Sequence, residues 1–177
     1  MKLINKNLVN ISNSLSFFRI FLAFPIYYLL AAGENIAALA VIAVAFATDF
    51  LDGYFARRFN QITEAGKILD PLADKVCTTT GFIALYLYQG FPLWLAAAII
   101  GRDLIILIAS LYFLNRKKVV LPSNRIGKIT VFFISFYAVV YILRWDVLQV
   151  YLYYLVIFFV LLSILNYGKV FLTELRT

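Results

Sequence analysis

Residues 49–74 read DFLDGYFARRFNQITEAGKILDPLAD, and this stretch carries four aspartates between two long apolar segments. Asp49 and Asp52 lie three residues apart. Asp70 and Asp74 lie four apart, and both spacings place a pair of side chains on one face of a helix. A carboxylate at the edge of an apolar span is costly unless it is paired, hydrated or bound to a cation. The stretch therefore predicts a helical hairpin, turning near residues 58–65, that brings the two acidic faces together.

The composition of the whole chain indicates a membrane protein. The chain has 177 residues, of which 64% are hydrophobic and 14% charged, whereas a soluble domain is nearer half apolar and a quarter charged. Apolar stretches of about 18 residues or more cross a bilayer as helices. Six candidates lie at residues 14–32, from 35 to beyond 46, 66–88, 92–114, 126–143 and 147–172. The sequence predicts an all-α, polytopic membrane protein with six transmembrane helices in a single domain, residues 1–177.

Residues 1–13 differ from the apolar stretches that follow them. Their apolar positions, such as Leu3, Ile4 and Leu8, fall near helical spacing, with Lys2 and Lys6 between them. This pattern predicts a short N-terminal amphipathic helix lying on the lipid headgroups. A frayed tail is the alternative.

Basic residues are distributed unevenly between the two sides that six spans define. The loops on one side hold only Arg144 as a basic residue, and cytoplasmic loops are the ones that carry an excess of Lys and Arg. We therefore expect both termini and the acidic hairpin on the cytoplasmic side of the cell membrane. Because this sidedness accounts for the net charge of +7, no nucleic-acid partner is predicted. The basic residues assigned to the cytoplasmic side are Lys2, Lys6, Arg19, Arg57, Arg58, Lys67, Lys75, Arg116, Lys117, Lys118, Arg125, Lys128, Lys169 and Arg176.

Missing residue types restrict the chemistry of the acidic hairpin. The sequence has no histidine and a single cysteine, Cys77, which excludes Ser-His-Asp triads, the usual zinc sites and a disulfide framework. Four ionised carboxylates in one pocket repel one another, so shared protons or divalent cations are expected with them. Oxygen-only ligation favours hard cations such as Mg²⁺, Mn²⁺ or Ca²⁺. Gly53, Ala56 and Gly66 leave room beside the carboxylates, although close helix packing is an alternative reason for small residues there.

The pattern D-x-x-D-G-x-x-A-R-x8-G-x3-D-x3-D is present at every fixed position from Asp49 to Asp74, and it resembles the signature of the CDP-alcohol phosphotransferase family. The resemblance implies that Asp49, Asp52 and Asp70 ligate two divalent cations, Mg²⁺ or Mn²⁺. It also implies that Asp74 is a ligand and the catalytic base, and that the protein is a homodimer. The implied donor is a CDP-activated lipid, with Arg57 as a clamp for its phosphate. A snorkelling anchor at the headgroups is the alternative role of Arg57.

Residues 10–19, NISNSLSFFR, resemble the N-I-P-N-x-L-T-x-x-R opening of bacterial phosphatidylglycerophosphate synthases, with Ser12 in place of proline and Ser16 in place of threonine. Asn13 would then hydrogen-bond the nucleotide, although an Asn that opens a helix is more often its cap. The donor-binding residues predicted are Asn13, Gly53, Ala56, Arg57 and Gly66.

Charges on the later spans are the candidates for binding the acceptor. Arg102 lies well inside the fourth span, where an arginine suggests function. As direct neighbours on a helix, Arg102 and Asp103 are not expected to pair. We expect Arg102 to reach the aspartates or, with Arg125 and Lys128, to bind an acceptor phosphate. A role as cytoplasmic anchors is the alternative for the last two. Relatives that use glycerol phosphate often carry Ala-Arg-Glu where this chain has Gly101-Arg102-Asp103, and Arg-Asp occurs in cardiolipin synthases.

The resemblance predicts an enzyme that transfers the phosphatidyl group of CDP-diacylglycerol to a polyol, with glycerol 3-phosphate favoured, and releases CMP. Acceptor alternatives are phosphatidylglycerol, as in cardiolipin synthase, inositol phosphate and serine. A divalent-cation or proton transporter is the alternative of another class, because acids inside a membrane also line permeation paths. The clustering of the aspartates toward one leaflet argues against a transporter, and an inactive scaffold that keeps the cations is a third possibility.

Overall fold

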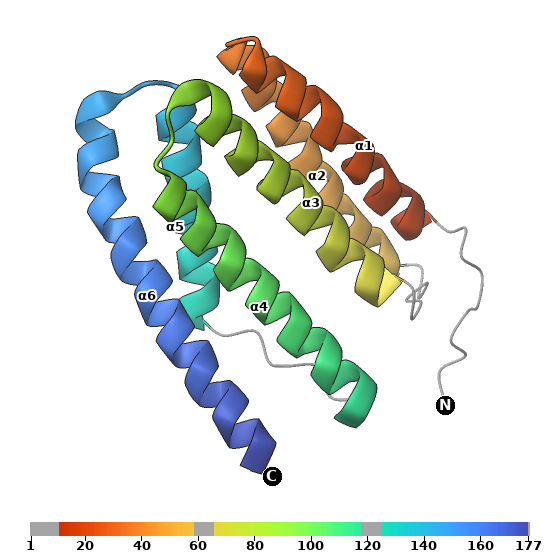
Figure 1. The fold of residues 1–177 in the computed structure, drawn as a ribbon. Helices are drawn as coiled ribbons and strands as arrows, with labels where there is room; N and C mark the ends of the chain where they lie inside the picture. The colour runs from red at the N-terminus through yellow and green to blue at the C-terminus, as the bar shows by residue number, and fades with distance from the viewer. Residues whose placement is uncertain (1–10, 59–65, 118–124, 177) are drawn as a thin grey trace. The chain divides into compact units, whose positions relative to one another are not determined.

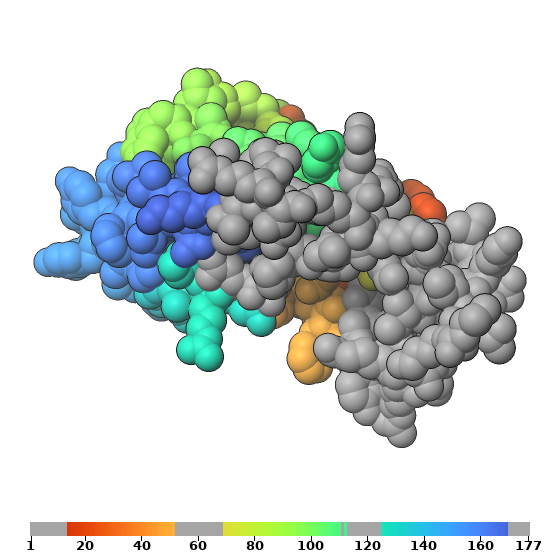
Figure 2. Space-filling view, turned by 90° about the horizontal axis from the view of Figure 1, so that it is seen from below, coloured from red at the N-terminus to blue at the C-terminus, as the bar shows by residue number. Residues whose placement is uncertain are grey.

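The computed structural model describes residues 11–58, 66–117 and 125–176, and every regular element within them is an α-helix. The predicted all-α class is thereby confirmed for this part of the chain. Most of the predicted N-terminal amphipathic helix falls on residues 1–10, which lie outside the described residues. Side chains are placed for residues 14–51, 69–110, 112 and 125–169, which are coloured in Figure 2. The described helices are α1 (Ile11–Ala31), α2 (Asn35–Arg58), α3 (Gly66–Gln89), α4 (Leu93–Lys117), α5 (Arg125–Ile142) and α6 (Asp146–Arg176).

Four of these helices contain a segment long and apolar enough to cross a membrane: Ser14–Ala31, Leu93–Ser110, Arg125–Ile142 and Asp146–Lys169. The apolar part of α2, Asn35–Leu51, is shorter. Helix α3 opens with charged residues, including Asp70, Asp74 and Lys75, and continues through three threonines, so its polar first half lowers its hydropathy. These helices describe a multi-pass membrane protein, and the count of six spans stays a prediction.

Contacts divide the chain into two compact units, Met1–Phe91 and Pro92–Thr177. In the first unit α1 packs along both α2 and α3, which contact each other far less (Figure 1). The core of this unit includes Ile26 and Leu30 of α1 and Ala84 and Leu85 of α3, all almost fully buried. In the second unit α6 packs against α5 and also contacts α4. The prediction of one domain, residues 1–177, stays a prediction.

A left-handed glycine turns the chain from α1 into α2. Gly33 has a φ of 75°, its N–H donates to the carbonyl of Leu30 at 3.3 Å, and the N–H of Glu34 donates to the carbonyl of Leu29 at 2.9 Å. This pair of bonds is the Schellman arrangement that ends many helices. The turn fixes where α2 starts, and therefore where along α1 the aspartates at the far end of α2 come to lie.

Gly33→Ala is expected to lower the free energy of unfolding by about 1 kcal/mol, because a Cβ is disfavoured in the left-handed region. Thermal unfolding of the purified protein in detergent measures the change. Gly168→Ala in α6 is the matched control, since a Cβ there meets no atom within 4 Å and alanine has the better helix propensity. Equal stability of the two variants would contradict the assigned turn.

Candidate active site

Helix α1 presents two polar side chains, Ser16 and Arg19, to the helices that carry the aspartates. The guanidinium of Arg19 is 2.7 Å from Asp49 on α2, measured from Nη1 to Oδ1. The hydroxyl of Ser16 donates a short hydrogen bond to Oδ1 of Asp70 on α3. Both α1 residues are buried, with Arg19 only 1% exposed. Helix α1 is therefore a third arm of the acidic site, beside the two arms that the sequence predicts.

The carboxylates of Asp49, Asp70 and Asp74, here called the aspartate cluster, lie in the first unit. Asp49 lies close enough to both Asp70 and Asp74 for their charges to act on it. The side chains of Asp49 and Asp74 are 49% and 43% exposed, so the protein does not enclose either carboxylate. Asp49 thus lies within range of the charges of Asp70 and Asp74, two of the other three aspartates that the sequence singles out.

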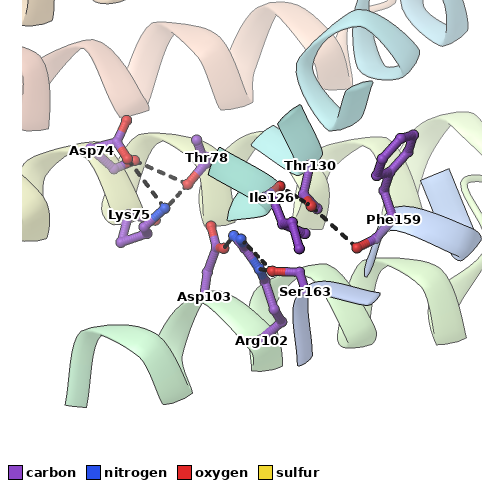
Figure 3. A network of polar contacts seen from close by, with 9 residues as sticks. All are labelled: Asp74, Lys75, Thr78, Arg102, Asp103, Ile126, Thr130, Phe159 and Ser163. Carbon is purple, nitrogen blue, oxygen red and sulfur yellow. Dashed lines mark hydrogen bonds and ion pairs between the residues drawn. The ribbon is translucent and has the colours of Figure 1, made fainter. Parts of the chain in front are cut away.

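Asp74 has its own local contacts on α3, shown in Figure 3. Its Oδ2 is 3.3 Å from Nζ of Lys75. The hydroxyl of Thr78, one turn further on, donates to the main-chain carbonyls of Asp74 at 3.0 Å and of Lys75 at 3.3 Å. Because Thr78 bonds the backbone, the Asp74 carboxylate remains available to other partners.

Several predicted site residues lie outside the described side chains. Helix α2 runs without interruption to Arg58, as required if its acidic and small residues are to share one face. Nothing is described of the side chains at five donor-site positions or at the fourth aspartate. They are Asn13, Asp52, Gly53, Ala56, Arg57 and Gly66, and their assigned roles stay predictions.

The chemistry of the aspartate cluster suits hard divalent cations. Its donors are carboxylate oxygens, which Mg²⁺ and Mn²⁺ prefer over nitrogen or sulfur. Cys77, the single thiol, donates to the main-chain carbonyl of Arg19 at 2.8 Å and is buried. Among the residues with placed side chains, no three acidic groups converge tightly enough to hold an ion. Arg19 and Ser16 each occupy an oxygen of the cluster, and the side chain of Asp52 is not among those described.

A second polar network lies in the second unit around Arg102, which is 5% exposed (Figure 3). Its Nε and Nη2 donate to the hydroxyl of Ser163 on α6 at 3.1 and 2.8 Å. Its Nη1 donates to Oδ1 of Asp103 at 2.5 Å. The guanidinium carbon also lies 5.8 Å from the centre of the Tyr167 ring. Arg102 therefore ties α4 to α6.

The expectation that Arg102 and Asp103 do not pair is wrong. Neighbouring side chains leave a helix in different directions, but the arginine stem is long enough to bend the guanidinium back to the adjacent carboxylate. Burial favours this contact, because the side chain of Asp103 is only 12% exposed and a buried charge needs a partner.

The remaining predicted acceptor residues, Arg125 and Lys128, are exposed on the first turn of α5. Between them Gly127 is buried against α6. A Cβ on Gly127 would lie 2.7 Å from the hydroxyl oxygen of Tyr167, so α5 and α6 approach closely there. The side chains of Arg125 and Lys128 are therefore exposed, beside a tight contact between α5 and α6.

Sequence reasoning missed three residues of these networks. The sequence places Arg19 among the cytoplasmic basic residues and at the end of the N-I-P-N-x-L-T-x-x-R resemblance, but its contact with the acidic site is not predicted. An arginine that interrupts an apolar stretch is a usable signal for such a role. Ser16 was noted only as a departure from threonine. No local pattern in the sequence shows that Ser163 faces Arg102, because that contact joins residues 61 positions apart.

The chain is similar to known proteins over much of its length. The family model for CDP-alcohol phosphatidyltransferase matches residues 9–164. A CDP-diacylglycerol–glycerol-3-phosphate 3-phosphatidyltransferase of Aquifex aeolicus is 38% identical over 133 residues, which are 72% of this chain and 72% of the relative. Its namesake from Pseudomonas fluorescens is 42% identical over 105 residues, 55% of this chain and 53% of that protein. A human cardiolipin synthase (CMP-forming) is 39% identical over 116 residues, 65% of this chain and 38% of that protein.

Proposed function

Because the chain belongs to the CDP-alcohol phosphatidyltransferase family, we propose that it transfers the phosphatidyl group of CDP-diacylglycerol to glycerol 3-phosphate, giving phosphatidylglycerophosphate and CMP. The similarity to the Aquifex aeolicus phosphatidyltransferase carries this proposal, since it covers equal and large shares of both chains. The aspartate cluster and its buried support from α1 provide the chemical groups that such a reaction needs.

The acidic residues hold the cofactors in this proposal. Asp49, Asp52, Asp70 and Asp74 bind two divalent cations, Mg²⁺ or Mn²⁺, which when bound neutralise the diphosphate and stabilise the departing CMP. The side chain of Arg57 clamps a phosphate of the donor. Asn13, Gly53, Ala56 and Gly66 complete the donor site.

Asp74 acts as the general base on the acceptor. Its carboxylate takes the proton of the acceptor hydroxyl while that oxygen bonds to the phosphorus bearing the diacylglycerol. The bond from this phosphorus to the bridging oxygen of the diphosphate breaks, and CMP leaves with the electron pair. The partial exposure of Asp74 supports this role, because a polar acceptor must reach the base from water.

The acceptor phosphate is bound by Arg102, Arg125 and Lys128. The exposed positions of Arg125 and Lys128 suit a soluble dianion. The guanidinium of Arg102 has N–H groups beyond those that donate to Ser163 and Asp103. Cardiolipin synthesis from phosphatidylglycerol is the second candidate, favoured by the human relative and by the Arg102-Asp103 pair.

The membrane arrangement follows from the same proposal. Six helices span the cell membrane, both termini face the cytoplasm and the aspartates lie at the cytoplasmic surface. The basic residues near α5 support this orientation. The active protein is a homodimer, as the family resemblance implies.

Release of CMP by the purified chain tests the reaction. The protein is incubated with CDP-diacylglycerol, Mg²⁺ and one acceptor at a time: glycerol 3-phosphate, phosphatidylglycerol, inositol phosphate or serine. We expect CMP release that requires Mg²⁺, is abolished by EDTA and is fastest with glycerol 3-phosphate. A preference for phosphatidylglycerol would favour cardiolipin synthesis. Absence of CMP release with every acceptor, together with Mn²⁺ or proton flux in proteoliposomes, would favour a transporter instead.

A further inference from the structure

The buried cationic side chain of Arg19 contacts the aspartate cluster from the interior of the protein. Arg19 is nearly inaccessible to solvent, and its guanidinium meets Asp49 at 2.7 Å. Its charge also acts on Asp70. A buried guanidinium is costly unless it is paired, so the carboxylates and Arg19 stabilise one another.

The position of Arg19 is fixed by the backbone as well as by its charge. The thiol of Cys77 on α3 donates to the main-chain carbonyl of Arg19, which joins α1 to α3 at this level. Ser16, three residues earlier on the same face of α1, holds Asp70 through its hydroxyl. The fold thus holds the guanidinium in place, unlike the flexible side chain of a surface arginine or lysine.

We propose that Arg19 is a built-in counter-cation of the aspartate cluster, which competes with divalent cations for Asp49 and so lowers the affinity of the site for them. The proposal rests on the proposed function, in which the cluster binds such cations. Arg19 approaches the same carboxylate that a divalent cation would use, and two positive charges on one carboxylate repel. Asp49 remains about half exposed, so part of its carboxylate stays open to a second cation while Arg19 holds it from the protein.

A fixed positive charge also has a use for catalysis. Facing carboxylates repel one another, and a guanidinium between the helices offsets this repulsion. The ligands then stay assembled while the cations bind more weakly than an all-acidic site would bind them. Arg19 is therefore a positioning residue that tunes the site without touching the substrate.

Mn²⁺ binding measured by electron paramagnetic resonance on the purified full-length chain tests this role. Arg19→Gln keeps a hydrogen-bond donor for Asp49 but removes the charge, and we expect it to bind Mn²⁺ about tenfold more tightly than the wild type. Arg19→Met is a second neutral variant with the same expected gain, in case one of the two does not fold. Arg19→Lys keeps the charge and is expected to stay near the wild-type affinity.

The control is Thr48→Val, which removes a buried hydroxyl next to Asp49 that donates to the carbonyl of Ala45. It is expected to leave the Mn²⁺ affinity unchanged. Unchanged or weaker binding by a folded neutral variant of Arg19 would overturn the counter-cation role. Asp49→Asn separates this failure from failure of the proposed function. If the wild type binds Mn²⁺ and Asp49→Asn weakens binding, the cation site stands whatever Arg19 does. If the wild type binds none, the cation site and the role of Arg19 both fall.

Discussion

Asp74→Asn is expected to lower the rate of CMP release by about 10²- to 10⁴-fold, the usual contribution of a positioned general base. The amide keeps the size of the side chain and one oxygen, but it cannot accept the proton of the acceptor hydroxyl. The fold should tolerate the change, because Asp74 is 43% exposed and its carboxylate pairs only loosely with Lys75 at 3.3 Å. Initial rates at saturating CDP-diacylglycerol and glycerol 3-phosphate measure the effect.

Thr78→Val is the matched control for Asp74→Asn. Thr78 lies one turn away on α3 and donates to the backbone of Asp74 rather than to its carboxylate. Exposed substitutions of this kind change stability by less than about 0.5 kcal/mol, so we expect the rate of CMP release to be preserved. A rate for Asp74→Asn within tenfold of the wild type would show that another group takes the proton. Retained Mn²⁺ binding by Asp74→Asn would separate loss of the base from loss of the cations.

The features that can be predicted well from this sequence are those that depend on residue spacing within a single helix. Apolar stretches place the described helices to within a few residues, and the spacing of Asp49, Asp70 and Asp74 selects residues that the structure brings near one another. Periodicity within α2 and α3 selects these residues, and the packing of both helices against α1 brings them near one another.

Contacts between residues that are far apart in the sequence cannot be predicted from local spacing. The predicted hairpin joins the two acidic arms directly, yet α2 and α3 scarcely touch each other and both pack against α1. Arg19 and Ser16 reach the acidic site through that packing, and no spacing in the sequence expresses it. The pairing of Arg102 with Asp103 was missed for a different reason, since it depends on side-chain length and burial rather than on helical geometry.

Arg102→Met is expected to lower the free energy of unfolding by about 3–5 kcal/mol, the usual effect of removing one partner from a buried ion pair. The variant deprives Asp103 of the guanidinium at 2.5 Å and the Ser163 hydroxyl of two donors. Because these contacts join α4 to α6, the loss should appear as a lower midpoint of thermal unfolding in detergent. The measurement needs no substrate, so it is independent of the acceptor.

The double variant Arg102→Met with Asp103→Asn tests whether the loss of stability comes from leaving the Asp103 carboxylate without its partner. If most of the loss comes from stranding the Asp103 carboxylate, removing its charge should restore more than half of the stability, and the two changes will be far from additive. Ser163→Ala should lose about 1–3 kcal/mol, because two buried donors lose their acceptor. Ser135→Ala, at an exposed serine of α5, should stay within about 0.5 kcal/mol of the wild type. Additive losses from Arg102 and Asp103 would mean that the short contact contributes little and that the two side chains stabilise the fold independently.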